Sequence, residues 1–269
     1  MMSGPLILGA SSRVGRMLHR LWQQGALDFG GTPLWQYRHD APGQAAHKII
    51  WDMLADTAPD IAPSGVICLA GATFGPDLAL SRDLALAAVD VAGDAPLLYA
   101  SSQAVYGPLS GVLTEDTPCQ PGAYGAAKLE AEAVLRRFPN ATSLRIANVI
   151  GADALLMNAA KGPVVLDQFA EGQSPKRMMI GPIALGQVFV DLLAAAPIAA
   201  PVINVAQPGM VAMADLLAAA GHRWTWQEAP ATAIANLELD LTVMQGLIHV
   251  PAADPATLVT EARLAGWGA

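Results

Sequence analysis

Short apolar runs alternate with segments of helical periodicity along most of this chain, and this alternation constrains the fold more than any other feature. The apolar runs have the length and residue types of strands, and they lie at Leu6–Leu8, Pro33–Tyr37, Lys48–Trp51, Val66–Ala70, Pro96–Ala100, Thr142–Ala147 and Val202–Val205. Helix-like segments separate several of them, at Val14–Gln24, Asp77–Ala92 and Ala123–Arg137. This order predicts an α/β fold with a parallel, doubly wound sheet. In such sheets ligands bind at the carboxyl ends of the strands.

Length and composition fit a single large core. The chain has 269 residues, which suits one large α/β domain, alone or with a small appendage. Hydrophobic residues make up 53% and charged residues only 14%. We therefore expect a large buried core and a lightly charged surface that another subunit partly covers.

Hydropathy and charge argue against two classes of partner. Mean hydropathy is +0.38, but an aspartate, two prolines and an asparagine interrupt the most apolar tract, 188–206. No uncharged span of about 20 residues is therefore present for a membrane helix. The amino terminus does not resemble a signal peptide. The net charge is −8 without a basic cluster, which argues against nucleic acid as a partner.

The cysteines and histidines predict neither a disulfide nor a metal site. Cys68 and Cys119 are the only cysteines, and Cys68 lies in an apolar run. Two reduced thiols are typical of a cytoplasmic protein. No ligand-like spacing relates the five histidines, His19, His39, His47, His222 and His249.

The turn after the first apolar run contains two glycines where a phosphate-binding loop often has three. In LILGASSRVGR, Gly9 can make a tight turn and Gly15 can let a helix pack on the strand, while Ser12 stands between them. Glycines serve such loops because the backbone must approach a pyrophosphate closely at a helix N-terminus. By itself, the stretch fits either a dinucleotide loop or an ordinary strand-to-helix turn.

A serine pair and a tyrosine–lysine pair follow later in the chain. Two serines leave the fifth apolar run in YASSQAVYG, and Tyr124 and Lys128 stand four residues apart in GAYGAAKLEAE. That spacing puts both side chains on one face of a helix. A phenol has a pKa of about 10, and a nearby ammonium favours its anion. The pair alone also fits an ordinary surface helix.

The combination of these motifs resembles one family. YASSQAVYG, the Tyr124–Lys128 pair and LRIANVIG at 144–151 occur in the order and spacing of the extended short-chain dehydrogenase/reductase family, also called the NAD-dependent epimerase/dehydratase family. GASSRVG, Asp52-Met53 and CLAGAT fall where that family has its cofactor motifs. The resemblance is close over about the first 150 residues. It implies a Rossmann-type core at 1–150 that returns at 186–206, with a small C-terminal substrate lobe at 151–185 and 207–269.

The resemblance also implies roles for individual residues. The catalytic residues would be Ser102, Tyr124 and Lys128. The cofactor would contact Gly9, Ser11, Ser12, Arg13, Val14, Gly15, Arg38, Asp52, Met53, Ala70, Gly71, Ala72, Ser101 and Lys128. The substrate would contact Thr73, Ser102, Gln103, Tyr124 and Asn148.

Three departures from the family pattern bear on activity. Ser12 replaces a glycine of the loop, and Ser81 replaces a helix asparagine. Gln103-Ala104 stands where sugar-nucleotide dehydratases carry an Asp-Glu pair, which argues against dehydration. Arg38, at the tip of the second strand, could pair with a 2′-phosphate, aided by Arg13, so we expect NADP(H) to be preferred over NAD(H). The alternative is a solvated arginine.

We therefore expect an NAD(P)-dependent oxidoreductase that acts on a carbinol or carbonyl carbon of a sugar-like or other small substrate. A nucleotide-sugar epimerase with transient cofactor redox is the alternative, and a cofactor-sensing regulator is disfavoured because the Tyr-Lys pair is intact. A short substrate lobe favours net hydride transfer, although Lys161, Lys176 and Arg177 could bind a diphosphate.

We also expect a homodimer. The helix at Asp77–Ala92 is apolar beyond one stripe, and Ala126, Ala133 and Val134 give Ala123–Arg137 a second apolar face. Family members pair these two helices across a two-fold axis.

Overall fold

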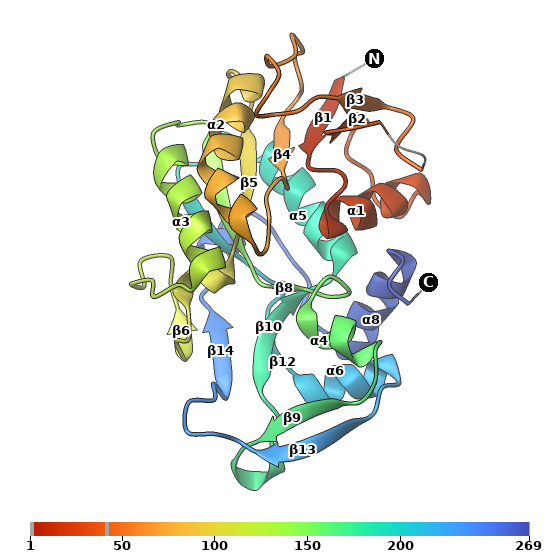
Figure 1. Cartoon of the computed structure of the whole chain (residues 1–269), viewed down its shortest axis with the longest axis vertical. Coiled ribbons are helices and arrows are strands. Elements are labelled where there is room, and N and C mark those ends of the chain that lie inside the picture. The colour runs from red at the N-terminus through yellow and green to blue at the C-terminus, as the bar shows by residue number, and fades with distance from the viewer. Residues whose placement is uncertain (1–2, 41–42, 269) are drawn as a thin grey trace.

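A seven-stranded parallel sheet forms the centre of the protein in the computed structural model, which describes residues 3–40 and 43–268 (Figure 1). Its strands run in the order β11-β7-β5-β4-β1-β2-β3. Their bounds are β1 Ser3–Leu8, β2 Thr32–Tyr37, β3 Lys48–Ile50, β4 Val66–Cys68, β5 Leu97–Ser102, β7 Ala141–Ile146 and β11 Val202–Val205. All seven predicted strands are therefore present, and the predicted parallel α/β sheet is confirmed.

Helices cover both faces of this sheet. Helices α1 (Arg13–Gln23) and α5 (Pro182–Ala194) pack together on one face, and α2 (Ser81–Ala92) and α3 (Ala123–Leu135) on the other. In β1, Ile7 belongs to the core beneath α1 and α5, whereas Leu6 and Leu8 belong to the core beneath α2 and α3. Burial on both faces explains why these strands read as continuous apolar runs.

The strand order reverses at β1. From β1 the chain passes outward to β2 and β3, and then returns to pair β4 on the other side of β1. A crevice forms at such a switch point, outside the carboxyl ends of the strands. The glycine turn that follows β1 lies at this position.

A second group of elements lies at the carboxyl side of the sheet (Figure 1). One sheet joins β12 (Met210–Ala212), β10 (Lys176–Ile180), β14 (Asn236–Leu239) and β6 (Gly111–Leu113), and β8 (Asn148–Val149) also pairs with β10. A separate pair is β13 (Trp224–Glu228) with β9 (Val164–Gln168). The helices here are α4 Ala154–Ala159, α6 Met213–Ala220, α7 Thr242–Gln245 and α8 Pro255–Leu264. The division into core and lobe at residues 150, 185 and 206 stays a prediction.

The predicted helix Asp77–Ala92 begins differently in the structure. A 3-10 turn, η1 (Pro76–Leu80), precedes α2, which starts at Ser81. Gly75 at φ +82° turns the chain, and Pro76 then occupies the first position, where no N–H is needed. Two further 3-10 turns are η2 (Gln103–Tyr106) and η3 (Ala170–Gly172).

Three findings concern the described residues as a whole. None of their helices is long and apolar enough to cross a membrane. No group of three or more His, Cys, Asp or Glu side chains among them could hold a metal ion. Cys68 is buried and Cys119 half-buried, and both are free thiols.

Candidate active site

Two adjoining pockets form one groove at the carboxyl ends of the central strands. The first, here named the tyrosine pocket, has a volume of about 510 Å³, and the second, the Arg38 pocket, about 410 Å³. Their shared walls are Ser12, Leu69, Gly71, Ala72 and Asp77. The groove therefore runs without a break from the tip of β2, past the glycine turn, to the start of α3.

Most of the predicted site residues line this groove. The tyrosine pocket is lined by Ser12, Arg13, Val14, Gly71, Ala72, Thr73, Ser101, Ser102, Tyr124, Lys128 and Asn148. The Arg38 pocket is lined by Gly9, Ser11, Ser12, Arg38, Met53, Ala70, Gly71 and Ala72. The predicted residues that line neither pocket are Gly15, Asp52 and Gln103.

The glycine turn is shaped by close backbone contacts. Gly9 has φ +75°, and a Cβ placed on it would lie 2.6 Å from the Ala70 nitrogen, so only glycine lets the ends of β1 and β4 approach. A Cβ on Gly15 would lie 2.7 Å from the carbonyl oxygens of Gly9 and Ala10. Gly15 therefore acts behind the groove, by letting α1 pack against the turn.

Ser12 caps helix α1 at the groove. Its hydroxyl accepts a hydrogen bond of 3.0 Å from the Gly15 N–H, and its own N–H donates to the Gly9 carbonyl at 2.9 Å. The backbone N–H of Ser12 is thus used within the turn, while its side chain remains in the wall of both pockets. The first turn of α1 carries no acidic residue. This helix N-terminus therefore presents its partial positive charge to the groove.

The two arginines near the groove line different pockets. Arg38 lines its own pocket with a half-exposed side chain, and its Nε lies 3.8 Å from an oxygen of Asp52. Arg13 lines the tyrosine pocket, and its guanidinium donates to the Ala152 carbonyl at 2.9 Å and contacts the Met157 sulfur. Arg13 thus links the glycine turn to α4, and it does not line the Arg38 pocket, where the two arginines were expected to act together on a 2′-phosphate.

Tyr124 and Ser102 meet inside the tyrosine pocket. Tyr124 is in the first turn of α3, and Ser102 ends β5. Burial raises the pKa of Tyr124 above its usual value of 10, and a hydrogen bond with Ser102 opposes that rise. The phenol of this protein is therefore protonated at neutral pH. The lysine effect expected from the sequence does not outweigh burial in the structure.

Lys128 lies beside them, one helical turn after Tyr124. Its ammonium donates to the Ala100 carbonyl at 2.8 Å and to the Tyr99 hydroxyl at 3.2 Å, and lies 5.9 Å from the centre of the Tyr124 ring. The side chain is 5% exposed, and burial lowers its pKa from 10.5 to about 8. At pH 7 Lys128 thus retains its charge in a largely desolvated position.

The two predicted residues next to Ser102 differ in their contacts. Ser101 is buried, and its hydroxyl donates to Glu132 at 2.5 Å. Gln103 lies in η2, and its buried side-chain oxygen has no hydrogen-bond partner among the described residues. The contacts of these two side chains therefore do not by themselves show a role in the groove.

Several lining residues could not be singled out from sequence motifs. Gln36 lines the Arg38 pocket, and its side-chain oxygen accepts from the Gly9 N–H at 2.8 Å. Phe74 lines the mouth of the tyrosine pocket and is 78% exposed. Asp153, in the same pocket, caps α4, and burial raises the pKa of its carboxyl. In the sequence, the only indication that Gln36 and Phe74 belong to the site is their position: Gln36 lies within WQYRHD, and Phe74 directly follows CLAGAT.

Comparisons with known proteins agree with this geometry. The model of the NAD dependent epimerase/dehydratase family matches residues 6–184. Comparison with curated proteins gives no match.

Solved structures match over nearly the whole chain. MoeE5 in complex with UDP-glucuronic acid and NAD is 20% identical, with 97% of this chain and 98% of that chain covered and a TM-score of 0.74. UDP-glucose 4-epimerase from Brucella ovis in complex with NAD is 17% identical, with coverage of 96% and 97% and a TM-score of 0.76. The UDP-Glc/GlcNAc 4-epimerase from Campylobacter jejuni is 16% identical, with coverage of 98% and 99% and a TM-score of 0.77. At these low sequence identities, the similarity shows a shared fold and nothing more specific.

Proposed function

Because this chain belongs to the NAD dependent epimerase/dehydratase family, a family of enzymes, we propose that it catalyses nicotinamide-dependent hydride transfer at a carbinol or carbonyl carbon. Tyr124 is the acid/base in this proposal, with Ser102 and Lys128 as its catalytic partners. The substrate is a sugar-like or other small compound.

One observation carries the proposal. Ser102, Tyr124 and Lys128 come from the end of β5 and the first turns of α3, and all three line the pocket that continues into the glycine turn. A groove of this kind brings a proton-transfer group and a dinucleotide site within reach of one substrate carbon.

The residues around the groove suit a dinucleotide. A side chain at Gly9 would collide with the backbone at Ala70, so glycine lets the turn pack closely on the end of β4, and both residues line the Arg38 pocket. The α1 N-terminus, with no acid in its first turn, attracts an anion at the same point. Ser11, Ser12 and Val14 would border the pyrophosphate, Met53 the adenine, and Lys128 the nicotinamide ribose.

A bound nicotinamide supplies the hydride donor or acceptor, and the protein supplies the proton and the geometry. The protonated phenol of Tyr124 donates its proton to a carbonyl oxygen as the adjacent carbon is reduced. Ser102 holds the same oxygen through its hydroxyl. In the reverse direction Tyr124 would accept the carbinol proton as a phenolate, after its own proton has left, and the nearby ammonium of Lys128 favours that anion.

A nucleotide-sugar epimerase is the second candidate. The similar structures favour it, because one holds UDP-glucuronic acid and two others are UDP-sugar 4-epimerases. Against it, the guanidinium of Arg177 is held by the carbonyls of Lys176, Ala235 and Ile234, and so is not free for a diphosphate. Lys161 is exposed and does not line the tyrosine pocket. We therefore favour net hydride transfer to a smaller substrate.

Absorbance of the reduced nicotinamide distinguishes the two candidates. Free sugars, sugar acids, other small carbonyl compounds and nucleotide sugars are supplied in turn with each cofactor. A net change that scales with a small substrate supports net hydride transfer. Inverted product without net cofactor change supports the epimerase and contradicts the first candidate.

The cofactor preference extends the proposal. Arg38 lines the groove at the tip of β2, where the 2′-position of the adenosine ribose would lie. Its contact with Asp52 is long and partly exposed, so a 2′-phosphate can replace it. We therefore favour NADP(H) over NAD(H), although similar structures were solved in complex with NAD.

Location and assembly belong to the same proposal. Two free cysteines, one of them buried, suit a reducing compartment such as the cytoplasm. A homodimer would cover the outer faces of α2 and α3, which lie side by side on one surface of the sheet (Figure 1).

A further inference from the structure

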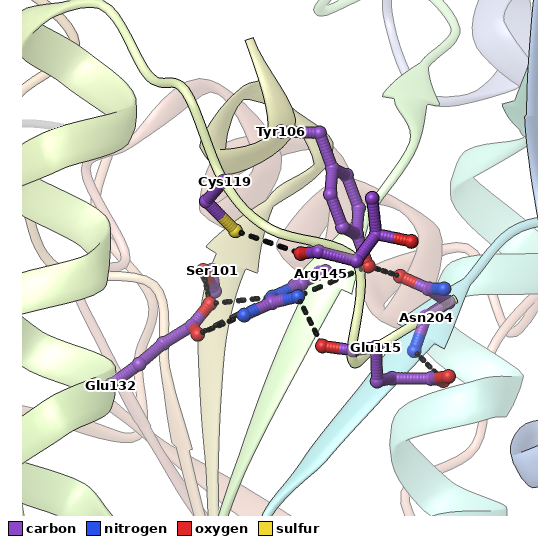
Figure 2. A network of polar contacts seen from close by, with 8 residues as sticks. Ser101, Tyr106, Glu115, Cys119, Glu132, Arg145 and Asn204 are labelled. Carbon is purple, nitrogen blue, oxygen red and sulfur yellow. Dashed lines mark hydrogen bonds and ion pairs between the residues drawn. The ribbon is translucent and has the colours of Figure 1, made fainter. Parts of the chain in front are cut away.

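A buried ion pair lies directly behind the proposed catalytic residues. Glu132 of α3 and Arg145 of β7 are 1% and 3% exposed, and their charged atoms approach to 2.9 Å (Figure 2). Two further contacts of 3.2 and 3.3 Å join the Arg145 Nε to the same carboxylate. Because desolvation is costly, a pair of this kind persists only where hydrogen bonds satisfy both groups.

The pair is satisfied on every side by neighbouring elements. The Ser101 hydroxyl of β5 donates to Glu132. Arg145 donates to the Tyr106 hydroxyl at 3.1 Å and to the Glu115 carbonyl at 2.9 Å. Tyr106 in turn donates to the Asn204 side chain of β11 at 2.6 Å (Figure 2). The network therefore fixes α3 to three strands of the central sheet.

The geometry of α3 links this network to the site. Glu132 follows Lys128 by four residues, so both lie on the helix face that is buried against the sheet. Ser101 precedes Ser102 in β5, and Lys128 is held by the carbonyl of Ala100 in that strand. A shift of Glu132 would thus displace α3 relative to the strand that carries Ser102.

We propose that Glu132 is a positioning residue: clamped by Arg145 and Ser101, its carboxylate anchors α3 to β5 and β7 and so places Lys128, one helical turn earlier, beside Tyr124 and Ser102. This inference rests on the proposed function for its consequence in catalysis. The contacts of Glu132 with Arg145 and Ser101 are independent of any ligand.

The electrostatics around Lys128 support this role. The titratable groups that face it are Cys68 of β4, Tyr99 of β5, and Tyr124 and Glu132 of α3. Burial raises the pKa of Cys68 to about 11 and raises that of Tyr99 and Tyr124, so all three are neutral where Lys128 titrates. The negative charge of Glu132 raises the pKa of Lys128 against the effect of burial.

Around Glu132 itself the facing groups are few. Arg145 forms the ion pair, and the negative charge of Glu132 raises the pKa of Cys119 and of Tyr99. Burial raises the pKa of Cys119 as well, so it adds no negative charge at neutral pH. If the negative charge of Glu132 is removed, no other acid among these neighbours can take its place in raising the pKa of Lys128.

The test measures Lys128 directly. The chain has only four lysines, so ¹³C-labelled lysine side chains can be assigned and titrated by NMR in the free protein. Glu132→Gln should lower the titration midpoint of Lys128 by about half a pH unit or more. Glu130→Gln is the matched control, because Glu130 is exposed on the same helix, and it should leave the midpoint unchanged.

A second variant guards against misfolding. Glu132→Gln leaves Arg145 buried without its partner, whereas Glu132→Leu with Arg145→Met replaces both charges by apolar side chains and should fold. The double variant removes the positive charge of Arg145 as well, so it should lower the Lys128 midpoint by less than Glu132→Gln does. A midpoint equal to that of the wild type in whichever variant folds overturns the inference, because a merely structural pair would not move it.

Cofactor binding separates this inference from the proposed function. The dissociation constant of a reduced nicotinamide dinucleotide is measured at pH 6.5 and 8.5. We expect Glu132→Gln to lose severalfold more affinity than the wild type between these two values, because Lys128 loses its charge earlier. If the wild type binds no dinucleotide, the proposed function fails, while the NMR titration still decides the role of Glu132.

Discussion

At the scale of single residues, the raised pKa of Tyr124 determines the protonation state in which its phenol meets a substrate. Burial keeps the phenol protonated, so in the free protein it is ready to act as an acid. Tyr124→Phe should lower turnover by about 100-fold or more and leave cofactor affinity nearly unchanged, because the phenol acts on substrate. Lys128→Ala should reduce both. Steady-state rates and dinucleotide titrations check this, and wild-type turnover in Tyr124→Phe would refute the assignment.

Arg38 decides the cofactor prediction. A charge-assisted hydrogen bond to a 2′-phosphate contributes about 1.5–3 kcal/mol, or roughly a 10- to 150-fold preference. Arg38→Ala should remove this preference for NADP(H), and Asp52→Asn should increase it by releasing Arg38 from its contact. Parallel titrations with NADPH and NADH measure the ratio. Tighter binding of NADH by the wild type contradicts the prediction.

Lys128 predicts a pH dependence of stability as well. Its pKa of about 8 in the folded protein lies below its usual value of 10.5, so the unfolded chain binds the proton more tightly between these values. Stability therefore rises with pH in this window, and the cost of the buried charge is fully present below pH 8. Relative to Lys128→Met, the wild type should gain about 2 kcal/mol in free energy of unfolding between pH 7.5 and 9.5.

Urea unfolding of both proteins across this range provides the measurement. The difference between the two proteins isolates Lys128 from the other titrating groups. A difference that stays constant, or that falls as pH rises, would show that Lys128 is not desolvated as the structure has it.

At the scale of elements, the junction of β1 and α1 depends on Gly15. An added Cβ would lie 2.7 Å from two backbone oxygens that cannot move independently. Gly15→Ala should therefore destabilise the protein by about 1–3 kcal/mol and weaken dinucleotide binding. Gly246→Ala is a matched control, because there the nearest atom would be 3.4 Å away, an ordinary contact. Equal melting temperatures for Gly15→Ala and the wild type would contradict the prediction.

The same elements explain what sequence could and could not predict. The central strands are buried on both faces and read as unbroken apolar runs, so their existence and order followed from pattern. Strands β6, β8 and β12 have only two or three residues, too few for a periodic signal. The groove was predictable because its residues follow strand ends in sequence. Contacts such as Tyr106 with Asn204, 98 residues apart, depend on tertiary packing that no local pattern encodes.

At the scale of the whole molecule, the outer faces of α2 and α3 support the homodimer prediction. Leu86 and Ala126 are half-buried and Ala133 is exposed, so small and apolar side chains remain at this surface. We expect sedimentation at micromolar concentration to give twice the mass of 27.8 kDa, and Leu86→Glu to shift the protein toward monomer. Leu247→Glu, at an exposed leucine outside both helices, should not. A wild type that sediments only as a monomer would contradict the prediction.

The buried network also has a consequence for synthesis. Asn204, which accepts from Tyr106, donates to the carbonyls of Leu113 and Asp240, so its last partner leaves the ribosome more than thirty residues after it. A nascent chain that ends before β11 has β7 as an unpaired edge of the sheet. Such an edge is a template for pairing with another chain. Truncated translation products of this protein that end before β11 should therefore associate through β7.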